Sequence, residues 1–476
     1  MIFSFTKVLN NKHIAILLKE IEDVSKYDFN DDEVSFINNA YDTDNQINIL
    51  TIDKLSKVYY ICIVNEKKNY NYIEGWRQIG DKIQAKVCND KQTELGIESL
   101  ADDEKIEYAF LEGAILGTYS FDKYLTKKAT KLEHIDINNP KITKKQLDSL
   151  NNICDAIYFT RDLINEPANV LDSVSLAKKF VEMGKETNLE IDVFDKKQIE
   201  TLKFGGLLAV NKGSVTPATF TIIKHNPKDA INKKPIVFVG KGLTFDSGGM
   251  NLKPGNYMND MKSDMSGGAI VGGLMYAIAK NELPVYTIGL IPATDNRVNG
   301  NAMTSGDIIT MFNKKTVEIT NTDAEGRLIL ADALSFADKY NPELVIDLAT
   351  LTGAASRAIG HFGIVAMGTA EEVDFDLLKK CGEETYERIV EFPFWTEYDS
   401  LIKSDVADLD NSGKSGFGGA ITAGKFLSNF VESNFIHLDI AGPAFINKRY
   451  NYNGTGGTGI GIRLLYNFLQ KKFIEK

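Results

Sequence analysis

The sequence predicts an α/β protein: a C-terminal domain with a mostly parallel sheet flanked by helices, and a smaller variable α/β domain at the N-terminus. Three observations support this fold class. The chain has 476 residues, more than one ordinary core accommodates, so two domains are expected. From about residue 205, apolar runs of strand length alternate with helical patterns. Such uninterrupted apolar runs are typical of strands buried on both faces. We place the first domain at residues 1–140 and the second, with its linker helix, at 141–476.

The N-terminal part of the chain is rich in lysine, asparagine and aspartate, with short apolar segments between. The run at 58–64 predicts a strand, and the pattern at 106–121 predicts a helix. The polar stretch at 132–146 contains a proline, which indicates a linker. A long helical pattern follows this stretch and stops at Pro167.

The C-terminal part shows the alternation of strands and helices most clearly. Strands are predicted at 235–240, 285–293, 343–353, 363–368 and 435–442. Helices are predicted at 266–280, 325–340 and 418–432. In sheets of this kind, ligands bind beyond the carboxyl ends of the strands.

Composition and charge exclude several classes of protein. The net charge of -11 argues against a broad nucleic-acid footprint, which needs basic surface. The four cysteines, Cys62, Cys88, Cys154 and Cys381, are scattered, which favours a reducing cytoplasm over a disulfide scaffold. The segment 1–13 lacks a signal-peptide pattern, and no apolar run approaches the roughly 20 residues that span a bilayer. We therefore expect a cytoplasmic protein without a membrane partner.

Charged and polar residues gather in four loops, each at the carboxyl end of a predicted strand or at the start of a predicted helix. In chain order they are Lys241, Asp246 and Lys253; Asp260 and Asp264; Asp323, Glu325 and Arg327; and Thr350 and Gly353. Because the carboxyl ends of parallel strands meet at one edge of a sheet, these residues are expected to share one rim.

Each of these residues also has a purely structural interpretation. Lys241 alone resembles a solvated charge after a strand, and Asp264 fits an N-cap or first-turn acid. Thr322 and Glu325 are three residues apart and fit a capping box at the start of a helix. The structural interpretation weakens for the set, because charged groups from different loops would converge on the same rim.

A cluster of carboxylates at one rim predicts bound cations, since carboxylates repel one another unless cations hold them. Oxygen-rich sites suit divalent metals, and zinc also accepts carboxylate oxygen. Asp323 and Glu325 can point to one side of an extended segment, while Asp246 and Asp264 add ligands from other loops. This supply fits two metals about 3.5–4 Å apart better than one. Lys241 could bind as a neutral amine, because a nearby dication lowers the pKa of its ammonium group.

The segments VGKGLTFDSGGMNLK (239–253) and NTDAEGRLILADAL (321–334) resemble the two signature segments of the leucyl aminopeptidase family, the dinuclear-metal cytosol aminopeptidases. The likeness continues through RDLINEPAN, GKFLSNFV, HLDIAG and GTGIGIRLL, and it covers roughly residues 155–470. It is faint or absent over the first 140 residues, where the family itself varies.

The resemblance implies a role for each residue of the four loops. The metal ligands match Lys241, Asp246, Asp264, Asp323 and Glu325, with Asp246 and Glu325 at the bridging positions. The catalytic positions match Lys253 and Arg327. The positions that hold a bicarbonate ion match Gly326, Arg327 and Leu328. The substrate pocket matches Met261, Thr350, Leu351 and Gly353. Met261 fits a plain core position equally well, and the family's frequent methionine after DIAG is missing from 443–445, which leaves the preferred N-terminal residue open.

The chemistry that the resemblance implies uses two divalent ions per subunit, Zn²⁺ or Mn²⁺ with Mg²⁺ as a further candidate, and bicarbonate. The metals lower the pKa of a bound water and bind the free amino group of the substrate. Lys253, kept protonated, stabilises the developing oxyanion. The planar guanidinium of Arg327 suits a carbonate-like anion, the expected general base.

The sequence therefore predicts a metalloexopeptidase that releases N-terminal residues, leucine-like ones preferred, from peptides with a free N-terminus. The resemblance also implies a homo-hexamer. Two alternatives stay open. One is a DNA-binding or scaffold protein built on the same fold, against which the acidic balance weighs. The other is a dinuclear metal phosphohydrolase, for which Lys253 and Arg327 could supply the phosphate clamps.

Overall fold

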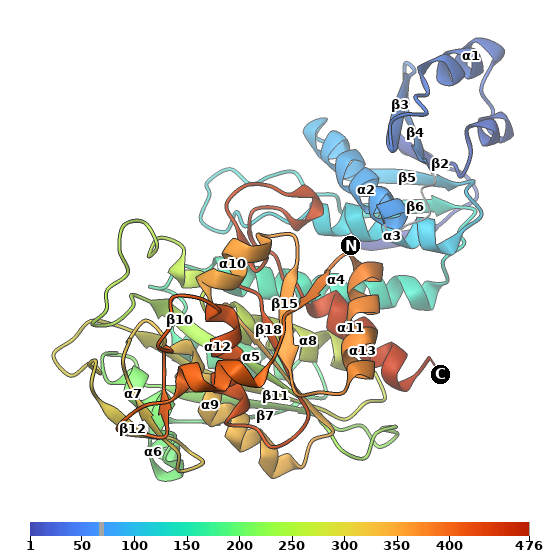
Figure 1. Cartoon of the computed structure of the whole chain (residues 1–476). Helices are drawn as coiled ribbons and strands as arrows, with labels where there is room; N and C mark the ends of the chain where they lie inside the picture. Colours follow the sequence, from blue (N-terminus) through green and yellow to red (C-terminus); the bar gives the residue numbers. More distant parts are fainter. Residues whose placement is uncertain (66–70, 476) are drawn as a thin grey trace. The chain divides into compact units, whose positions relative to one another are not determined.

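The computed structural model describes residues 1–65 and 71–475, which form two compact units (Figure 1). The units consist of Met1–Tyr158 with Lys448–Thr455, and of Phe159–Asn447 with Gly456–Lys476. The division falls inside the helix α4 (Lys144–Asn165), which runs from one unit into the other. The domain limits expected at 1–140 and 141–476 stay a prediction.

Within the described residues, the first unit contains a six-stranded sheet with the order β1-β6-β5-β2-β4-β3. Its strands are β1 (Ile2–Phe5), β2 (His13–Leu17), β3 (Ile47–Asp53), β4 (Val58–Val64), β5 (Glu94–Ser99) and β6 (His134–Asn138). Its helices are α1 (Asp31–Ala40), α2 (Asn71–Asn89) and α3 (Glu104–Gly117), with the short 3₁₀ helices η1 (Ile21–Lys26) and η5 (Asn451–Asn453). The strand predicted at 58–64 is β4, and the helix predicted at 106–121 is α3.

The linker predicted at 132–146 is wrong in its first half, where β6 pairs in parallel with both β1 and β5. Ile135 and Ile137 are fully buried, whereas the alternating residues are half-exposed. Two apolar side chains are too few to indicate a strand within a polar stretch. The hydrogen bonds that make β6 a strand come from partners far away in the sequence.

Within the described residues, the second unit contains a nine-stranded sheet with the order β16-β15-β18-β14-β9-β11-β8-β7, and β10 pairs with β11. Its strands are β7 (Glu190–Phe194), β8 (Thr219–His225), β9 (Ile236–Gly240), β10 (Gly242–Asp246), β11 (Thr287–Asn296), β14 (Leu344–Ala349), β15 (Ile364–Gly368), β16 (Ile389–Glu391) and β18 (Phe435–Asp439). The central neighbours β18, β14, β9 and β11 all pair in parallel. The predicted mostly parallel sheet is thus confirmed.

Helices cover both faces of this sheet (Figure 1). They are α5 (Ser173–Gly184), α6 (Lys196–Leu202), α7 (Gly205–Asn211), α8 (Ser266–Lys280), α9 (Gly326–Ala337), α10 (Gly353–Ile359), α11 (Glu372–Thr385), α12 (Gly419–Ser428) and α13 (Ile462–Phe473). The unit also contains the short 3₁₀ helices η2 (Met261–Ser263), η3 (Asp338–Tyr340) and η4 (Thr396–Ile402). The helices predicted at 266–280, 325–340 and 418–432 are α8, α9 and α12.

The alternation of side chains along β11 separates the two faces. Ile288 and Leu290 belong to a core that also contains residues of α7, α9 and α12. Gly289, between them, lies against Val271 and Met275 of α8. α8 is therefore packed on the opposite face from α9, and its all-round apolar character is that of a buried helix.

Two small sheets complete the second unit within the part of the chain that the structure describes. One joins β12 (Ile308–Thr310), β13 (Thr316–Glu318) and β17 (Leu409–Asp410); the other joins β19 (Phe445–Ile446) and β20 (Gly456–Gly457). β13 and β17 pair in parallel, with Glu318 opposite Asp410. The chain leaves β13 directly toward the segment that carries Asp323 and Glu325.

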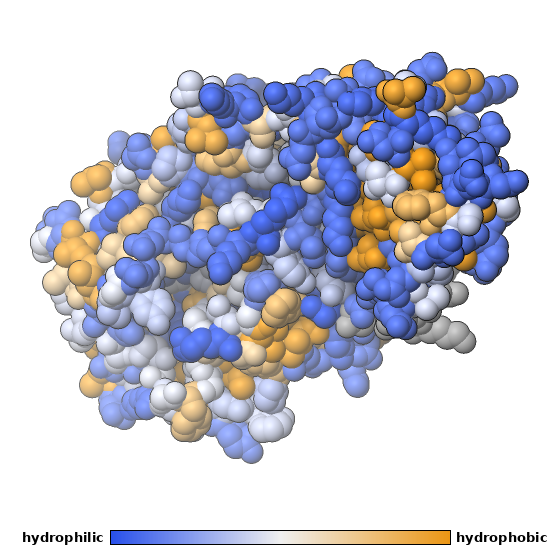
Figure 2. Space-filling view, turned by 90° about the horizontal axis from the view of Figure 1, so that it is seen from above, coloured by the Kyte–Doolittle hydropathy of each residue, from blue (hydrophilic) through white to orange (hydrophobic). Residues whose placement is uncertain are grey.

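The face seen in Figure 2 is mostly hydrophilic, with smaller hydrophobic groups between, in keeping with a chain of which 25% is charged. No helix in the described residues combines the length and the apolar composition that crossing a membrane requires.

Asp332 supports the packing of α9 and gives a test of the fold. Its carboxylate is fully buried and accepts the backbone N–H groups of Leu207 in α7 and of Phe312, both at 2.9 Å. Asp332→Ala leaves these buried donors without partners. We expect the free energy of unfolding, measured by urea denaturation, to fall by about 3 kcal/mol. The control is Asp376→Ala, which removes an exposed ion pair with Lys379 and should change it by less than about 0.5 kcal/mol. Equal midpoints for the two variants would contradict this account.

Candidate metal centre

Lys241 lies at a break between two strands that run along the same partner. β9 and β10 both pair in parallel with β11, so the chain continues along β11 on either side of Lys241. The backbone N–H of Lys241 donates to the carbonyl of Leu348 in β14 at 3.1 Å. Lys241 therefore lies at an interruption of a central strand, and its long side chain is buried.

The ammonium group of Lys241 contacts three oxygen atoms from three different loops. Its Nζ lies 2.8 Å from Asp264 Oδ2 and 3.1 Å from Glu325 Oε1. It also donates to the carbonyl of Thr350 at 3.1 Å. The Thr350 hydroxyl in turn donates to Asp264 Oδ1 at 2.7 Å. The loops that follow β9 and β14 and those that precede α8 and α9 thus meet around one lysine, as the strand-end argument predicts.

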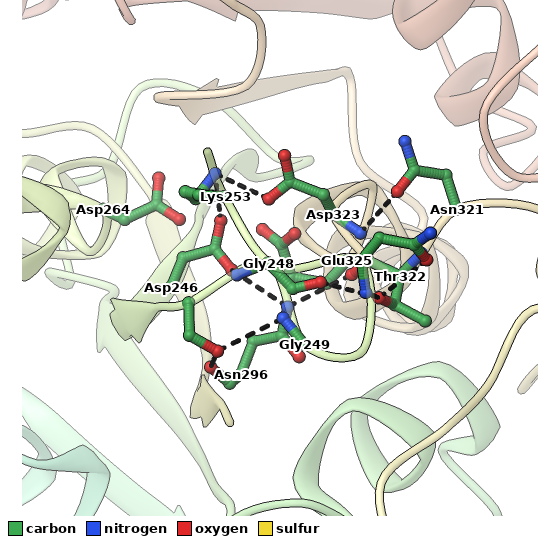
Figure 3. Close-up of polar contacts among 12 residues, drawn as sticks. Asp246, Gly248, Gly249, Lys253, Asp264, Asn296, Asn321, Thr322, Asp323 and Glu325 are labelled. Atoms are coloured by element: carbon green, nitrogen blue, oxygen red, sulfur yellow. Dashed lines mark hydrogen bonds and ion pairs between the residues drawn. The ribbon is translucent and has the colours of Figure 1, made fainter. Parts of the chain in front are cut away.

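Lys253 makes a second pair of contacts beside the first (Figure 3). Its Nζ lies 2.6 Å from Asp246 Oδ2 and 2.6 Å from Asp323 Oδ1. The other oxygen of Asp246, the last residue of β10, accepts the Gly248 N–H at 2.8 Å and the side-chain amide of Asn296 at 2.9 Å. Asp246 is therefore oriented by groups that leave Oδ2 directed at the cluster.

Three of the carboxylates converge closely enough to share a cation. Asp246, Asp323 and Glu325 each offer one oxygen, and these three oxygens all lie within 4.8 Å of one another. The second oxygen of Glu325, Oε2, is buried and has no hydrogen-bond partner among the described residues. An unpartnered buried carboxylate oxygen is costly. The donor set therefore fits divalent cations, which prefer carboxylate oxygen.

Burial and mutual repulsion act on the protonation of the carboxylates. Burial raises the pKa of Asp264 to about 7; the charge of Lys241 opposes this rise, while Asp246 and Glu325 add to it. Burial, with the charge of Glu325, also raises the pKa of Asp323. These directions are those expected for acids held together in a desolvated space. Cations bound within the cluster would favour the ionised carboxylates and so offset both the desolvation and the mutual repulsion.

The pKa values of the two lysines are also raised, which favours their charged form. Burial acts to lower the pKa of Lys241, but the charges of Asp264, Glu325 and Asp246 outweigh it, and the pKa is raised. For Lys253, burial is again outweighed, first by Asp246 and then by Glu325, and the pKa is raised. Both ammonium groups therefore act as counter-charges to the carboxylates of the cluster.

The capping interpretations are wrong. α9 has Glu325 itself as its N-cap residue, without a side-chain cap bond, and α8 has Met265 rather than Asp264. The Thr322 hydroxyl instead donates to the carbonyl of Gly248 at 2.6 Å and accepts the N–H of Asn251 at 2.8 Å. Thr322 therefore ties the 321–325 loop to the loop after β10. Thr322 therefore hydrogen-bonds to a loop that is distant in the chain and not to the first turn of α9.

Two glycines allow the close approach of these loops. A Cβ on Gly326 would lie 2.4 Å from Cε and 2.6 Å from Nζ of Lys241, which real side chains do not reach. Gly248 has φ +85°, in the region that favours glycine. Its missing Cβ would lie 3.0 Å from Asp323 Oδ1. The loops can therefore approach only where the side chain is absent.

Arg327 lies in the first turn of α9, next to the carboxylate cluster. Its Nη1 donates to the carbonyl of Asn411 at 2.7 Å, while its Nε is buried without a partner among the described residues. Burial lowers the pKa of Arg327 to about 10. The side chain of Leu328 belongs to the core and its N–H donates to Glu325 O at 2.9 Å. The buried guanidinium of Arg327 therefore offers an unused donor.

The residues predicted for the substrate pocket differ in their contacts. Thr350 belongs to the cluster through Lys241 and Asp264. Leu351 is half-buried against the core of the second unit, and Gly353 is exposed at the start of α10. Met261 is half-buried in η2, just before Asp264. The structure places these three on the segments beside the cluster.

Several asparagines support the cluster, and the sequence analysis missed them. Asn296 orients Asp246, and Asn321 Oδ1 accepts the N–H of Asp323 at 2.9 Å (Figure 3). Asn411 contacts both the 320–324 segment and Arg327. Their partners are backbone groups or residues far away in the chain, so no spacing in the sequence marks them.

Comparison with known proteins identifies relatives for most of the chain. A model of the cytosol aminopeptidase family, catalytic domain, matches residues 158–466. A probable cytosol aminopeptidase of Chlorobium limicola is 44% identical over 380 residues, 76% of this chain and 75% of that protein. Another, of Sulfurihydrogenibium sp., is 39% identical over 445 residues, 90% of this chain and 87% of that one.

Solved structures share the fold over nearly the whole chain. The cytosol aminopeptidase of Coxiella burnetii has a TM-score of 0.84 at 27% identity, covering 99% of both chains. A bottromycin maturation enzyme in complex with Mn has a TM-score of 0.86 at 27% identity, covering 97% of this chain and 99% of that one.

Gly326→Ala tests whether the packing of Lys241 against α9 is needed for the site. The added Cβ displaces the Lys241 side chain, while alanine suits a helix better than glycine by about 1 kcal/mol. We expect the fold to be retained and the affinity for Co²⁺, followed by its visible absorption, to fall about 10–100-fold. Gly300→Ala is the matched control, because nothing lies within 4 Å of its added Cβ. Unchanged Co²⁺ affinity in Gly326→Ala would refute this requirement.

Proposed function

The chain belongs to the cytosol aminopeptidase family and is a metal-dependent aminopeptidase, and on this premise we propose which of its residues perform the reaction. The observation that carries the proposal is the meeting of Asp246, Asp323 and Glu325 within 4.8 Å, beside a buried lysine. With Lys241 and Asp264, they are the proposed ligands of two divalent metal ions. The Mn in the structure of a similar enzyme supports Mn²⁺ as one of them, with Zn²⁺ and Mg²⁺ as the alternatives.

Lys241 is the proposed amine ligand. It already lies within 3.1 Å of Asp264 and Glu325, so a cation bound to those carboxylates would lie next to Nζ. A dication there opposes the protonation of the amine. The carboxylates that raise the pKa of Lys241 would then be neutralised by metal instead of by the ammonium group. Lys241 would therefore exchange its proton for a metal bond.

A bound metal pair supplies a water of lowered pKa, polarises the scissile carbonyl and anchors the free amino group of the peptide. Lys253 keeps its proton in this proposal. Once cations neutralise Asp246 and Asp323, the ammonium group no longer has to pair with them. The Lys253 side chain is 14% exposed, so a bound substrate could contact it. It would face the oxygen of the scissile carbonyl and stabilise the negative charge that develops there.

Arg327 is the proposed holder of a bicarbonate ion, which would supply the general base. Its Nη1 is occupied by Asn411 O, but Nε remains unpartnered. A guanidinium with an unused donor suits a planar anion. Gly326 and Leu328, on either side of it, are the proposed backbone neighbours of that ion. The N–H of Leu328 would have to leave Glu325 O to contribute.

The pocket for the first residue of the peptide is assigned to Met261, Thr350, Leu351 and Gly353. Apolar Met261 and Leu351 suit a leucine-like side chain, and Thr350 joins this wall to the metal ligands. Homo-hexameric assembly and a cytoplasmic location remain predictions from the family resemblance and from the cysteine pattern. The DNA-binding or scaffold alternative and the phosphohydrolase alternative are not favoured, since the matched relatives are aminopeptidases.

The basic test is metal-dependent hydrolysis of aminoacyl amides. Purified chain with added Mn²⁺ or Zn²⁺ should release the first residue from leucine amide and from dipeptides, and chelation should abolish the release. A phosphate-ester substrate and an N-acetylated dipeptide serve as controls and should not be cleaved, because the proposed site needs a free amine. Cleavage of the phosphate ester alone would favour the phosphohydrolase instead.

The two lysines should separate metal binding from turnover. Lys241→Ala should lower the metal content by at least one ion per chain, measured by elemental analysis. Lys253→Ala should keep the metal and lower kcat about 10²–10³-fold, the usual effect of losing one oxyanion contact. The exposed lysine in Lys228→Ala is the control and should change neither quantity. Loss of metal in both site variants, or in neither, would overturn this division of roles.

A further inference from the structure

Asn411 lies outside the carboxylate cluster, between two segments that the proposed reaction needs. It directly follows β17 and is fully buried. Its backbone N–H donates to the carbonyl of Glu318, the last residue of β13, at 3.1 Å. The parallel pairing of β13 with β17 therefore carries Asn411 to the place where the chain enters the 320–324 segment.

The side-chain amide of Asn411 is used at both ends by the backbone of residues 320–324. Its Oδ1 accepts the N–H groups of Thr320 at 2.8 Å and of Asn321 at 3.2 Å. Its Nδ2 donates to the carbonyls of Asn321 at 2.7 Å and of Ala324 at 3.4 Å. This segment delivers Asp323 and leads into Glu325. A single buried amide thus replaces the regular hydrogen bonding that an irregular segment lacks.

The backbone carbonyl of Asn411 makes the second connection, to Nη1 of Arg327 at 2.7 Å. This hydrogen bond orients the guanidinium and leaves the buried Nε unpartnered. The same residue therefore contacts both the segment that carries Asp323 and leads into Glu325 and the side chain proposed to hold the anion. A displacement of Asn411 would move these two groups relative to each other.

We propose that Asn411 is a positioning residue of the aminopeptidase reaction, whose side chain sets the ligand segment and whose backbone carbonyl sets Arg327. The proposal rests on the roles proposed above for Asp323, Glu325 and Arg327. Asn411 itself offers no carboxylate to a metal and acts only through these groups.

The chemistry of the amide explains why asparagine occupies this position. Aspartate has nearly the same shape but no donor, so it would direct a carboxylate at the carbonyls of Asn321 and Ala324. Alanine would leave the N–H groups of Thr320 and Asn321 and the carbonyl of Ala324 without this partner, while the carbonyl of Asn321 would keep only the N–H of Ala324 at 3.2 Å. A buried polar group that loses its partner costs about 1–3 kcal/mol. Glutamine is one methylene longer than a fully buried position tolerates without strain.

The test compares Asn411→Ala and Asn411→Asp with wild type as the full-length, metal-loaded enzyme. The matched control is Asp408→Ala. Asp408 lies just before β17, and its exposed carboxylate accepts the N–H and the hydroxyl of Thr316 in β13 at 2.8 and 2.9 Å. It joins the same two strands, and among the described residues it makes no hydrogen bond or ion pair with residues 320–324 or with Arg327. Circular dichroism and the melting temperature establish which variants are folded at the assay temperature.

We expect both Asn411 variants to bind Mn²⁺ about 10–100-fold more weakly in calorimetric titration, as when supporting residues of metal ligands are replaced. At saturating Mn²⁺, kcat should also fall about 10–100-fold while KM stays within about threefold, because misplacement affects the reacting geometry more than binding. Asp408→Ala should match wild type in all three quantities.

A double variant separates positioning from general destabilisation. If Asn411 acts in part through Arg327, the loss of kcat in Asn411→Ala should be smaller in an Arg327→Ala background than in the wild-type background, and the loss that remains measures the effect on the ligand segment. A folded Asn411→Ala or Asn411→Asp with wild-type Mn²⁺ affinity and kcat would overturn the proposal, and so would an equal loss in Asp408→Ala. Because Asn411→Asp keeps the shape and size of the residue, it supplies the answer if Asn411→Ala does not fold. Inactivity of the wild type would instead refute the proposed function, and the Mn²⁺ titration would still test Asn411.

Discussion

Mutual repulsion of buried carboxylates is the constraint on which this site depends. Four acids and two lysines form one cluster. Asp246, Asp264, Glu325 and Lys241 are buried, and Asp323 and Lys253 are half-buried. The positive charges of the two lysines do not balance four carboxylates, and the buried oxygen Glu325 Oε2 has no hydrogen-bond partner among the described residues. Such an arrangement costs stability unless further positive charge enters. The protein therefore maintains, at the cost of folding free energy, a site whose electrostatics divalent metal ions would complete.

The parallel sheet brings the members of this cluster together. Strand ends deliver Lys241, Asp246 and Thr350 to one edge, and the helices α8 and α9 begin there with Asp264 and Glu325 beside them. Neutral side chains then hold the loops to one another through backbone hydrogen bonds. Such bonds are insensitive to the charge of the site, so the loops can keep their geometry whether ammonium groups or metal ions balance the carboxylates.

Much of this organisation could be predicted from the sequence, and the failures share one cause. The strands β9, β11, β14, β15 and β18 and the helices α8, α9 and α12 follow apolar runs and periodicities, which are local, and the sequence predicts them. The polar stretch that contains β6 predicts a linker, and the spacing of Thr322 and Glu325 predicts a helix cap. In both cases the deciding hydrogen bonds come from residues distant in the chain. Asn296 and Asn411 were missed because an isolated asparagine has many structural uses, and its partners here are known only from the fold.

The sequence by itself determined the fold class and the family, together with the acids and lysines of the site, because these depend on residue types at set spacings along the chain. Tertiary structure alone decided which lysine pairs with which carboxylate and that Asn411 connects the ligand segment to Arg327. It also decided that position 326 has no room for a Cβ beside the Lys241 side chain. The physical reason is the range of the interactions. Periodicity and motif spacing act within a few residues, whereas ion pairs and buried hydrogen bonds require atoms within about 3 Å that only the folded chain brings together.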